Sequence, residues 1–280
     1  MIRQSGCRLF THPALASMLA LLWCHVILIR TAYADEDVTA QSVYTDETAS
    51  VQAAWISAIG NDRVDTLARL LEDHSPDLLL PLTASNGKTA LMVAAKLGDK
   101  AFARSLVAAG SDINSRTVTG GTAFMFAILG DDLELARWFR TLGADVHVQG
   151  TNGWTAVTIA SAKGFTKTLE WLLEIGADGR VPDVYRFTPL MRAVGNDHLP
   201  AARLLIEKAQ ANVNAVDEYD NTPLHHAVSV SLETGQSDMV ELLLNAGASA
   251  LSENREGVTP LAIASKSEAL SSLLTSSTSK

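Results

Sequence analysis

The chain has 280 residues, of which 47% are hydrophobic and 19% are charged, and its formal net charge is −9. This composition is typical of a folded protein and excludes wholesale disorder. The first 34 residues hold three bases and no acid, so residues 35–280 carry 19 basic against 31 acidic residues, a net charge of −12. An acidic surface repels phosphate backbones, so nucleic acid is not expected as a partner.

The first 34 residues have the layout of a secretory signal peptide. Arg3 and Arg8 precede an apolar stretch at 14–29, and Ala32-Tyr33-Ala34 forms a small-x-small site before an acidic run. We therefore predict cleavage after Ala34 and a periplasmic or secreted protein of bacterial type. The alternative is an uncleaved anchor, but the apolar stretch is shorter than the roughly 20 residues that span hydrocarbon. No stable membrane insertion is expected after cleavage.

Both cysteines, Cys7 and Cys24, lie in this first segment. After cleavage the chain has no thiol, which excludes a disulfide framework and a thiolate metal site. Residues 35–50 are polar and are predicted to form a flexible lead-in.

A short motif repeats along the rest of the chain. A threonine, then a small residue or proline, then an apolar residue recur at Thr89, Thr122, Thr155, Thr188, Thr222 and Thr259. The spacings are 33, 33, 33, 34 and 37 residues. Six matches in phase indicate a repeat architecture and are far more specific than a single short motif.

The motif resembles the ankyrin repeat, whose period is 33 residues and whose signature is T-P-L-H-x-A. The copy at 222–227 reads Thr-Pro-Leu-His-His-Ala, and a Gly-Ala-Asp element follows in several repeats, for example at 143–145. The fourth repeat lacks this glycine and reads Lys-Ala-Gln-Ala-Asn at 208–212. The resemblance covers roughly residues 50–275 and implies an all-α ankyrin-repeat solenoid, with stacked helix-turn-helix units and β-hairpin-like loops.

Helix physics supports the same reading. Threonine caps a helix by accepting a bond from an orphan backbone N–H, and proline fits the first helical position. The glycines after the second helices, such as Gly143 and Gly176, stand where a helix end favours a left-handed residue. Short helices are marginal alone, so each repeat must bury its apolar face against its neighbours.

The two ends are predicted to be caps. Residues 51–84 carry apolar residues at helical spacing without the threonine start, and the unit that begins at Thr259 is rich in serine. Terminal repeats with polar outer faces keep a solenoid soluble. We predict an N-terminal cap at 51–84, repeats and C-terminal cap within 85–275, and a tail at 276–280.

No pattern predicts an enzyme, a cofactor site or a metal site. H-E-x-x-H, G-x-S-x-G and phosphate-binding glycine loops are all missing from the sequence. His225 stands at the family's structural histidine position, which implies bonds to neighbouring backbone. His226 follows it directly, and adjacent helical residues point about 100° apart, so the two do not chelate one ion.

The repeat resemblance implies that a partner protein binds the concave face, which the loop tips and first helices form. Bulky rings at the tips are Trp154, Tyr185, Phe187 and Tyr219, and the flanking acids are Asp217, Glu218 and Asp220. Exposed aromatic residues are enriched in binding hot spots, so these seven residues are the predicted partner site. The alternative is that the rings pack on adjacent loops and only stiffen them. The binding hypothesis predicts that alanine at 154 and 187 abolishes capture and leaves the melting temperature nearly unchanged.

The fifth repeat has about four extra residues within Ser229–Gln236. They either lengthen the first helix or widen the loop after it. Insertions often map to the binding face, but surface loops also tolerate neutral ones.

The sequence therefore predicts an exported, monomeric module that binds a partner protein as a scaffold, protector or inhibitor. The alternative is a secreted effector or toxin-associated factor that acts on a host protein. Retention in the periplasm favours the first and release favours the second.

Overall fold

The computed structural model describes residues 46–278, which form helices and loops without a β-strand. The predicted all-α class is confirmed, and the loops are turns rather than paired strands. The predicted signal peptide at 1–34, the two cysteines and lead-in residues 35–45 lie outside the described residues. By contacts, the chain separates between Ala54 and Trp55 into two units, and the packing below is that of residues 55–278.

Residues 46–60 are helical, although the lead-in was expected to be flexible through residue 50. No glycine or proline occurs between residues 35 and 59. No helix-breaking residue therefore forces the helix to begin at residue 51 rather than earlier.

The N-terminal cap continues with α2 (Val64–Asp73) and a short helix α3 (Pro76–Leu79) that the periodicity did not indicate. Proline at the first position of α3 fits because its missing N–H has no partner there anyway. Four large apolar side chains of the cap are completely buried, namely Trp55, Ile59, Leu67 and Leu79.

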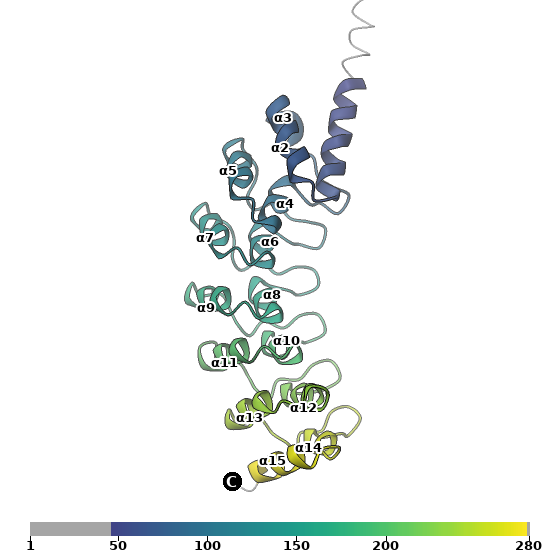
Figure 1. The fold of residues 1–280 in the computed structure, drawn as a ribbon, viewed down its shortest axis with the longest axis vertical. Helices are drawn as coiled ribbons and strands as arrows, with labels where there is room; N and C mark the ends of the chain where they lie inside the picture. The colour runs from purple at the N-terminus through teal and green to yellow at the C-terminus, as the bar shows by residue number, and fades with distance from the viewer. Residues whose placement is uncertain (1–45, 279–280) are drawn as a thin grey trace, which may run out of the picture. The chain divides into compact units, whose positions relative to one another are not determined.

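Five helix pairs follow, each beginning at a predicted threonine. The first helices are α4 (Ala90–Leu97), α6 (Ala123–Leu129), α8 (Ala156–Lys163), α10 (Pro189–Gly195) and α12 (Pro223–Thr234). The second helices are α5 (Lys100–Ala108), α7 (Leu133–Thr141), α9 (Thr166–Glu174), α11 (Leu199–Glu207) and α13 (Asp238–Asn245). First and second helices form two separate layers, and the long loops between repeats project from the first-helix layer (Figure 1).

Five of the six threonines cap the first helices as expected, whereas the Thr222 hydroxyl lies 2.9 Å from His225 Nδ1 instead. The Thr155 hydroxyl, for example, accepts a bond from the Thr158 N–H at 3.2 Å. Glycines follow the C-terminal ends of the second helices, and Gly176, for example, adopts φ = 88°. Where the fourth repeat lacks this glycine, Gln210 takes the left-handed conformation, with φ = 51°. The repeat geometry therefore overrides the residue's own preference.

An alanine five residues after each threonine lets the first helices approach one another. These residues are at most 1% exposed and comprise Ala94, Ala127, Ala160, Ala193, Ala227 and Ala264. A larger side chain there would separate neighbouring repeats, because solenoid stability depends on each interface.

The insertion in the fifth repeat lengthens the first helix. Helix α12 has 12 residues, whereas α4 and α8 have eight, and it ends at Gly235 with φ = 76°. The extra residues therefore extend the helix rather than widen a loop.

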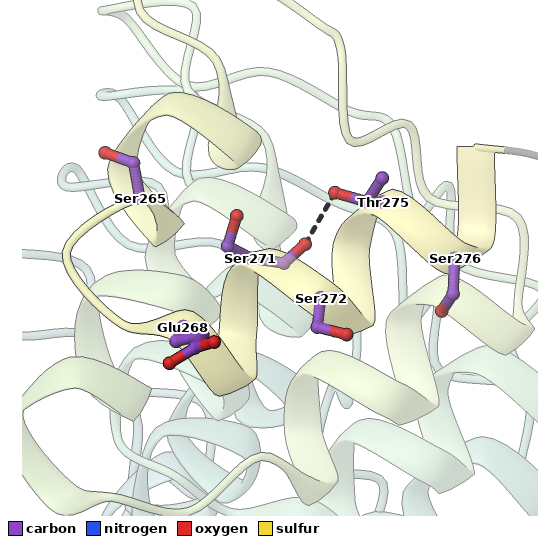
Figure 2. A pocket seen from close by; sticks show the side chains of 6 residues that line it. All are labelled: Ser265, Glu268, Ser271, Ser272, Thr275 and Ser276. Carbon is purple, nitrogen blue, oxygen red and sulfur yellow. Dashed lines mark hydrogen bonds between the residues drawn. The ribbon is translucent and has the colours of Figure 1, made fainter.

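The C-terminal cap consists of α14 (Pro260–Ala264) and α15 (Glu268–Thr278). Leu270 and Leu274 are buried, and the other side of α15 carries small polar residues around an open hollow of about 670 Å³ (Figure 2). This side of α15 thus presents a polar surface. Residues 276–278 belong to α15, so the predicted tail begins inside this helix.

Candidate functional site

One backbone hydrogen bond links each loop tip to the next. We call the tips at 85–88, 118–121, 151–154, 184–187, 218–221 and 255–258 the loop-tip row. The N–H to carbonyl bonds run from Val118 to Asn86, from Thr151 to Thr119, from Val184 to Asn152, from Glu218 to Tyr185 and from Arg255 to Tyr219, at 2.8–3.2 Å. Side chains along the row are therefore held at fixed spacing.

A buried acid shapes the fourth and the fifth tip. Asp183 Oδ1 accepts bonds from the Tyr185 and Phe187 N–H groups at 2.9 and 3.0 Å. Asp217 Oδ1 accepts the equivalent bonds from Tyr219 and Asn221 at 2.8 and 3.0 Å. A carboxylate that accepts two backbone bonds fixes the loop without a β-hairpin.

Asp217 was expected to flank a partner, but it is 1% exposed. Its second oxygen lies 3.0 Å from His226 Nε2, so both oxygens are used inside the protein. Asp217 therefore positions Tyr219 and does not itself face a partner.

Asp183 and Arg192 repeat this arrangement one unit earlier. They form an ion pair in which the carboxylate is completely buried and the guanidinium half-buried. Arg192 and His226 each lie four residues after the repeat threonine, and their acids lie five residues before it. Each pair thus ties a loop tip to its own first helix.

Four side chains from three repeats stack in a row. The Arg192 guanidinium lies 5.2 Å from the Trp154 ring and 4.5 Å from the Phe187 ring. Phe187 in turn lies 5.1 Å from the His226 ring, with the two planes at 44°. A guanidinium between two aromatic faces is a favourable cation–π arrangement. We call Trp154, Arg192, Phe187 and His226 the central stack.

Burial lowers the pKa of His226, and the nearby Arg192 charge acts in the same direction, while Asp217 partly opposes them. The neutral ring then donates from Nε2 to Asp217. His225 has a structural role, as expected, since its Nδ1 accepts from the Thr222 N–H at 2.9 Å and its Nε2 lies 3.0 Å from the Val258 carbonyl. Burial is also the main reason that the pKa of His225 is lowered.

The residue two before each threonine is left-handed in every repeat. Glycine occupies this place in four of them, at Gly87, Gly120, Gly153 and Gly257. Arg186 and Asp220 replace it in the fourth and fifth tips, with φ of 61° and 63°. An arginine in this region costs about 1–2 kcal/mol, whereas an aspartate adopts it at a smaller cost.

The two strained tips also display the exposed tyrosines. Tyr185 is 54% exposed and Tyr219 is 57% exposed, each directly before a strained residue. Asp220 joins Arg186 at 3.5 Å and Arg255 at 3.7 Å, so a charged bridge links consecutive tips. The Arg255 guanidinium also lies 5.9 Å from the Tyr219 ring.

The predicted rings thus divide into two groups. Trp154 and Phe187 are half-buried in the central stack, whereas Tyr185 and Tyr219 extend into solvent. Glu218 and Asp220 are partly exposed beside the tyrosines. Sequence reasoning missed Arg186 and Asp183 together with Arg192. The signal that could have marked the strained tip is that Arg186 stands two residues before its threonine, where four other repeats have glycine.

Within residues 46–278, no group of three or more His, Cys, Asp or Glu side chains is placed to hold a metal ion. No helix in the same part of the chain is long and apolar enough to cross a membrane.

Comparison with known proteins agrees with the fold. The family model for ankyrin repeats in three copies matches residues 51–150 and 124–217, and the single ankyrin-repeat model matches residues 219–255. No curated protein matches the chain. Among solved structures, the ankyrin repeat domain of human ASB11 is similar, with a TM-score of 0.65 and 23% identity over 80% of this chain and 96% of that one. The chain belongs to the ankyrin-repeat family.

Proposed function

We propose that this protein binds a partner protein through the concave face, with the fourth and fifth loop tips at the centre of contact. Ankyrin repeats are interaction modules, which supports the general role. Tyr185 and Tyr219 would supply the anchors, with Glu218 and Asp220 beside them. Trp154 and Phe187 contribute their exposed edges and hold the tips in place.

The observation that carries this proposal is the coincidence of backbone strain with exposed aromatic rings. Arg186 and Asp220 adopt left-handed conformations where other tips have glycine, and each follows an exposed tyrosine. Strained conformations persist where the surrounding structure enforces them, and they cluster at binding sites. The hydrogen-bonded tips also pre-organise the tyrosines, which reduces the ordering cost of association.

The proposed role is that of a monomeric, non-catalytic scaffold, protector or inhibitor that needs no cofactor. Ankyrin-repeat proteins are generally non-enzymatic scaffolds. The acidic surface supports protein rather than nucleic acid as the partner.

The proposed site of action is outside the cytoplasm, in the periplasm or after secretion. The support is the charge and hydropathy pattern of residues 1–34. Mass spectrometry of the purified protein tests this, because a mature N-terminus at Asp35 is expected and an intact Met1 would contradict export. Release into the medium would favour the alternative role of an effector that acts on a host protein.

The binding role is tested by affinity capture from an extracytoplasmic extract of the source organism. The double variant Tyr185→Ala with Tyr219→Ala should lose a stoichiometric partner that the unchanged protein retains. Leu142→Ala with Leu251→Ala is the matched control, since it also removes two exposed apolar side chains, away from the tips. Equal capture by both double variants would overturn the proposed site.

A further inference from the structure

An apolar cavity of about 250 Å³ opens beside the central stack, between the second and third repeats. We call it the apolar socket, and its apolar lining consists of Gly121, Met125, Phe126, Leu129, Trp154 and Ile159. Leu129 is 37% exposed at the rim, and Phe126 is half-buried. Pockets for whole small molecules are larger, about 300–1,000 Å³, so this volume suits a single side chain.

The apolar socket exists because one repeat lacks a side chain that the next two have. The residue directly before the threonine is Trp154 in the third repeat and Phe187 in the fourth, and both cover Arg192. In the second repeat this residue is Gly121. A Cβ built on it would lie 3.2 Å from Thr117 Oγ1 and 3.4 Å from the Phe126 ring, so even one methyl group would occupy the space between that hydroxyl and the ring. The position left open by glycine is thus next to exposed apolar surface.

The loop-tip row is acidic at its other end. Glu218 and Glu256 in the fifth and sixth tips, and Glu253 just before the sixth tip, form no ion pair within residues 46–278, whereas Arg186 and Arg255 both contact Asp220. The second and third tips, at 118–121 and 151–154, have no charged residue. The row therefore presents an apolar hollow at one part and unpaired negative charge at another.

From this arrangement we infer that the partner presents one extended segment with a large apolar side chain and, some distance along, basic residues. The apolar side chain fills the apolar socket against Trp154, and the basic residues pair with Glu218, Glu253 and Glu256. Hydrophobic burial then provides affinity, and complementary charge fixes the register and accelerates encounter. This inference rests on the proposed function and adds the chemistry of the partner.

The geometry also sets the spacing between the two features. Neighbouring helices pack about 8–10 Å apart, so the sixth tip lies roughly 25–30 Å along the row from the third. An extended chain advances about 3.3 Å per residue, so roughly eight or nine residues separate the apolar residue from the most distant basic residue.

The test is selection of a phage-displayed random peptide library on the immobilised full chain, followed by affinity measurement with the enriched synthetic peptides. Enriched peptides should share one large apolar residue and two or more Lys or Arg residues at the stated distance. Gly121→Ala and Leu129→Ser should each weaken the peptides about tenfold, a change of about 1.4 kcal/mol. Glu253→Gln with Glu256→Gln should weaken them at low salt and flatten the salt dependence.

Matched controls keep the test specific. Gly195→Ala makes the same change where a Cβ meets nothing within 4 Å, and Leu97→Ser removes an exposed leucine outside the socket. Both should bind like the unchanged protein. Peptides without the shared pattern, or equal loss in variants and controls, would overturn the inference. If Tyr185→Ala abolishes partner capture while Gly121→Ala changes neither capture nor peptide affinity, the proposed function stands and the socket inference fails.

Discussion

Arg186 Nη1 lies 3.5 Å from Asp220 Oδ1, and both residues are left-handed where the other loop tips carry glycine. An exposed ion pair of this kind contributes at most about 1 kcal/mol, which is no more than the backbone strain at Arg186. The pair is therefore poorly explained by stability alone. It holds two charged groups and two tyrosines on adjacent tips.

Replacing the strained residues by glycine should stabilise the protein and weaken partner binding. Arg186→Gly should raise the free energy of unfolding by up to about 1 kcal/mol, because glycine relieves left-handed strain that exceeds the lost ion pair, and Asp220→Gly should raise it by less, since aspartate tolerates this conformation better. Urea denaturation checks the stability, and capture of the partner checks the binding. Gly153→Ala is the opposite control and should destabilise, since its Cβ would lie 2.5 Å from the Asp183 Cα. Lower stability in both glycine variants would refute the strain argument.

Phe187→Ala should destabilise the protein by about 1–3 kcal/mol, because it uncovers Arg192 and His226 together. Tyr185→Ala, two residues away, should change stability by no more than about 0.5 kcal/mol, since the ring is exposed. Chemical denaturation of both variants measures the difference. The sequence alone predicts that alanine at 154 and 187 together leaves the melting temperature nearly unchanged, whereas the stacking geometry predicts a loss of stability.

The stability of the fold should fall as the pH drops below about 7. The pKa values of His225 and His226 are lowered in the folded state from the ordinary value of 6.5. As the pH falls through 6.5, the unfolded chain binds protons first, so unfolding becomes easier. Urea midpoints at several pH values between neutrality and mild acid, above the range where carboxylates titrate, measure the slope. His226→Gln keeps an N–H donor for Asp217 and should reduce the slope of stability against pH. An unchanged slope would contradict the attribution of the pH dependence to His226.

Gln210→Gly should stabilise the fourth repeat by about 1 kcal/mol, because Gln210 holds φ = 51° where other repeats use glycine. The reverse change, Gly176→Gln, should destabilise the third repeat by a similar amount. Thermal unfolding of the two variants shows whether the shifts have opposite signs. Shifts in the same direction would mean that backbone strain at the residue after the second helix does not determine the stability of these repeats.

Most of the repeat architecture follows from local chemistry that the sequence displays. The capping threonines, the glycine corners and the period of 33 residues are local signals, and the structure places helices where they indicate. The first five residues of the helix at 46–60 and the whole of α3 were missed because neither segment carries a repeat motif. The length of α12 was left open because an insertion of polar residues suits both a helix and a loop.

The candidate site was less predictable because its key contacts join residues from different repeats. Asp217 was grouped with exposed acids, yet the loop buries it under His226. Arg192 lies in a helix and shows no motif, so its position between Trp154 and Phe187 appears only when repeats are stacked. The apolar socket likewise depends on Gly121, whose lack of a side chain matters only beside Phe126.

Site-specific photo-cross-linking in the source organism shows whether the fourth and fifth loop tips contact a partner protein. A photoreactive phenylalanine analogue would replace Tyr185 or Tyr219 in the full chain, with Leu142 as the control position. Our account predicts the same cross-linked partner from positions 185 and 219, outside the cytoplasm, and none from position 142. Cross-linking from position 142 alone, or from none of the three in cells that yield a stable complex, would contradict it.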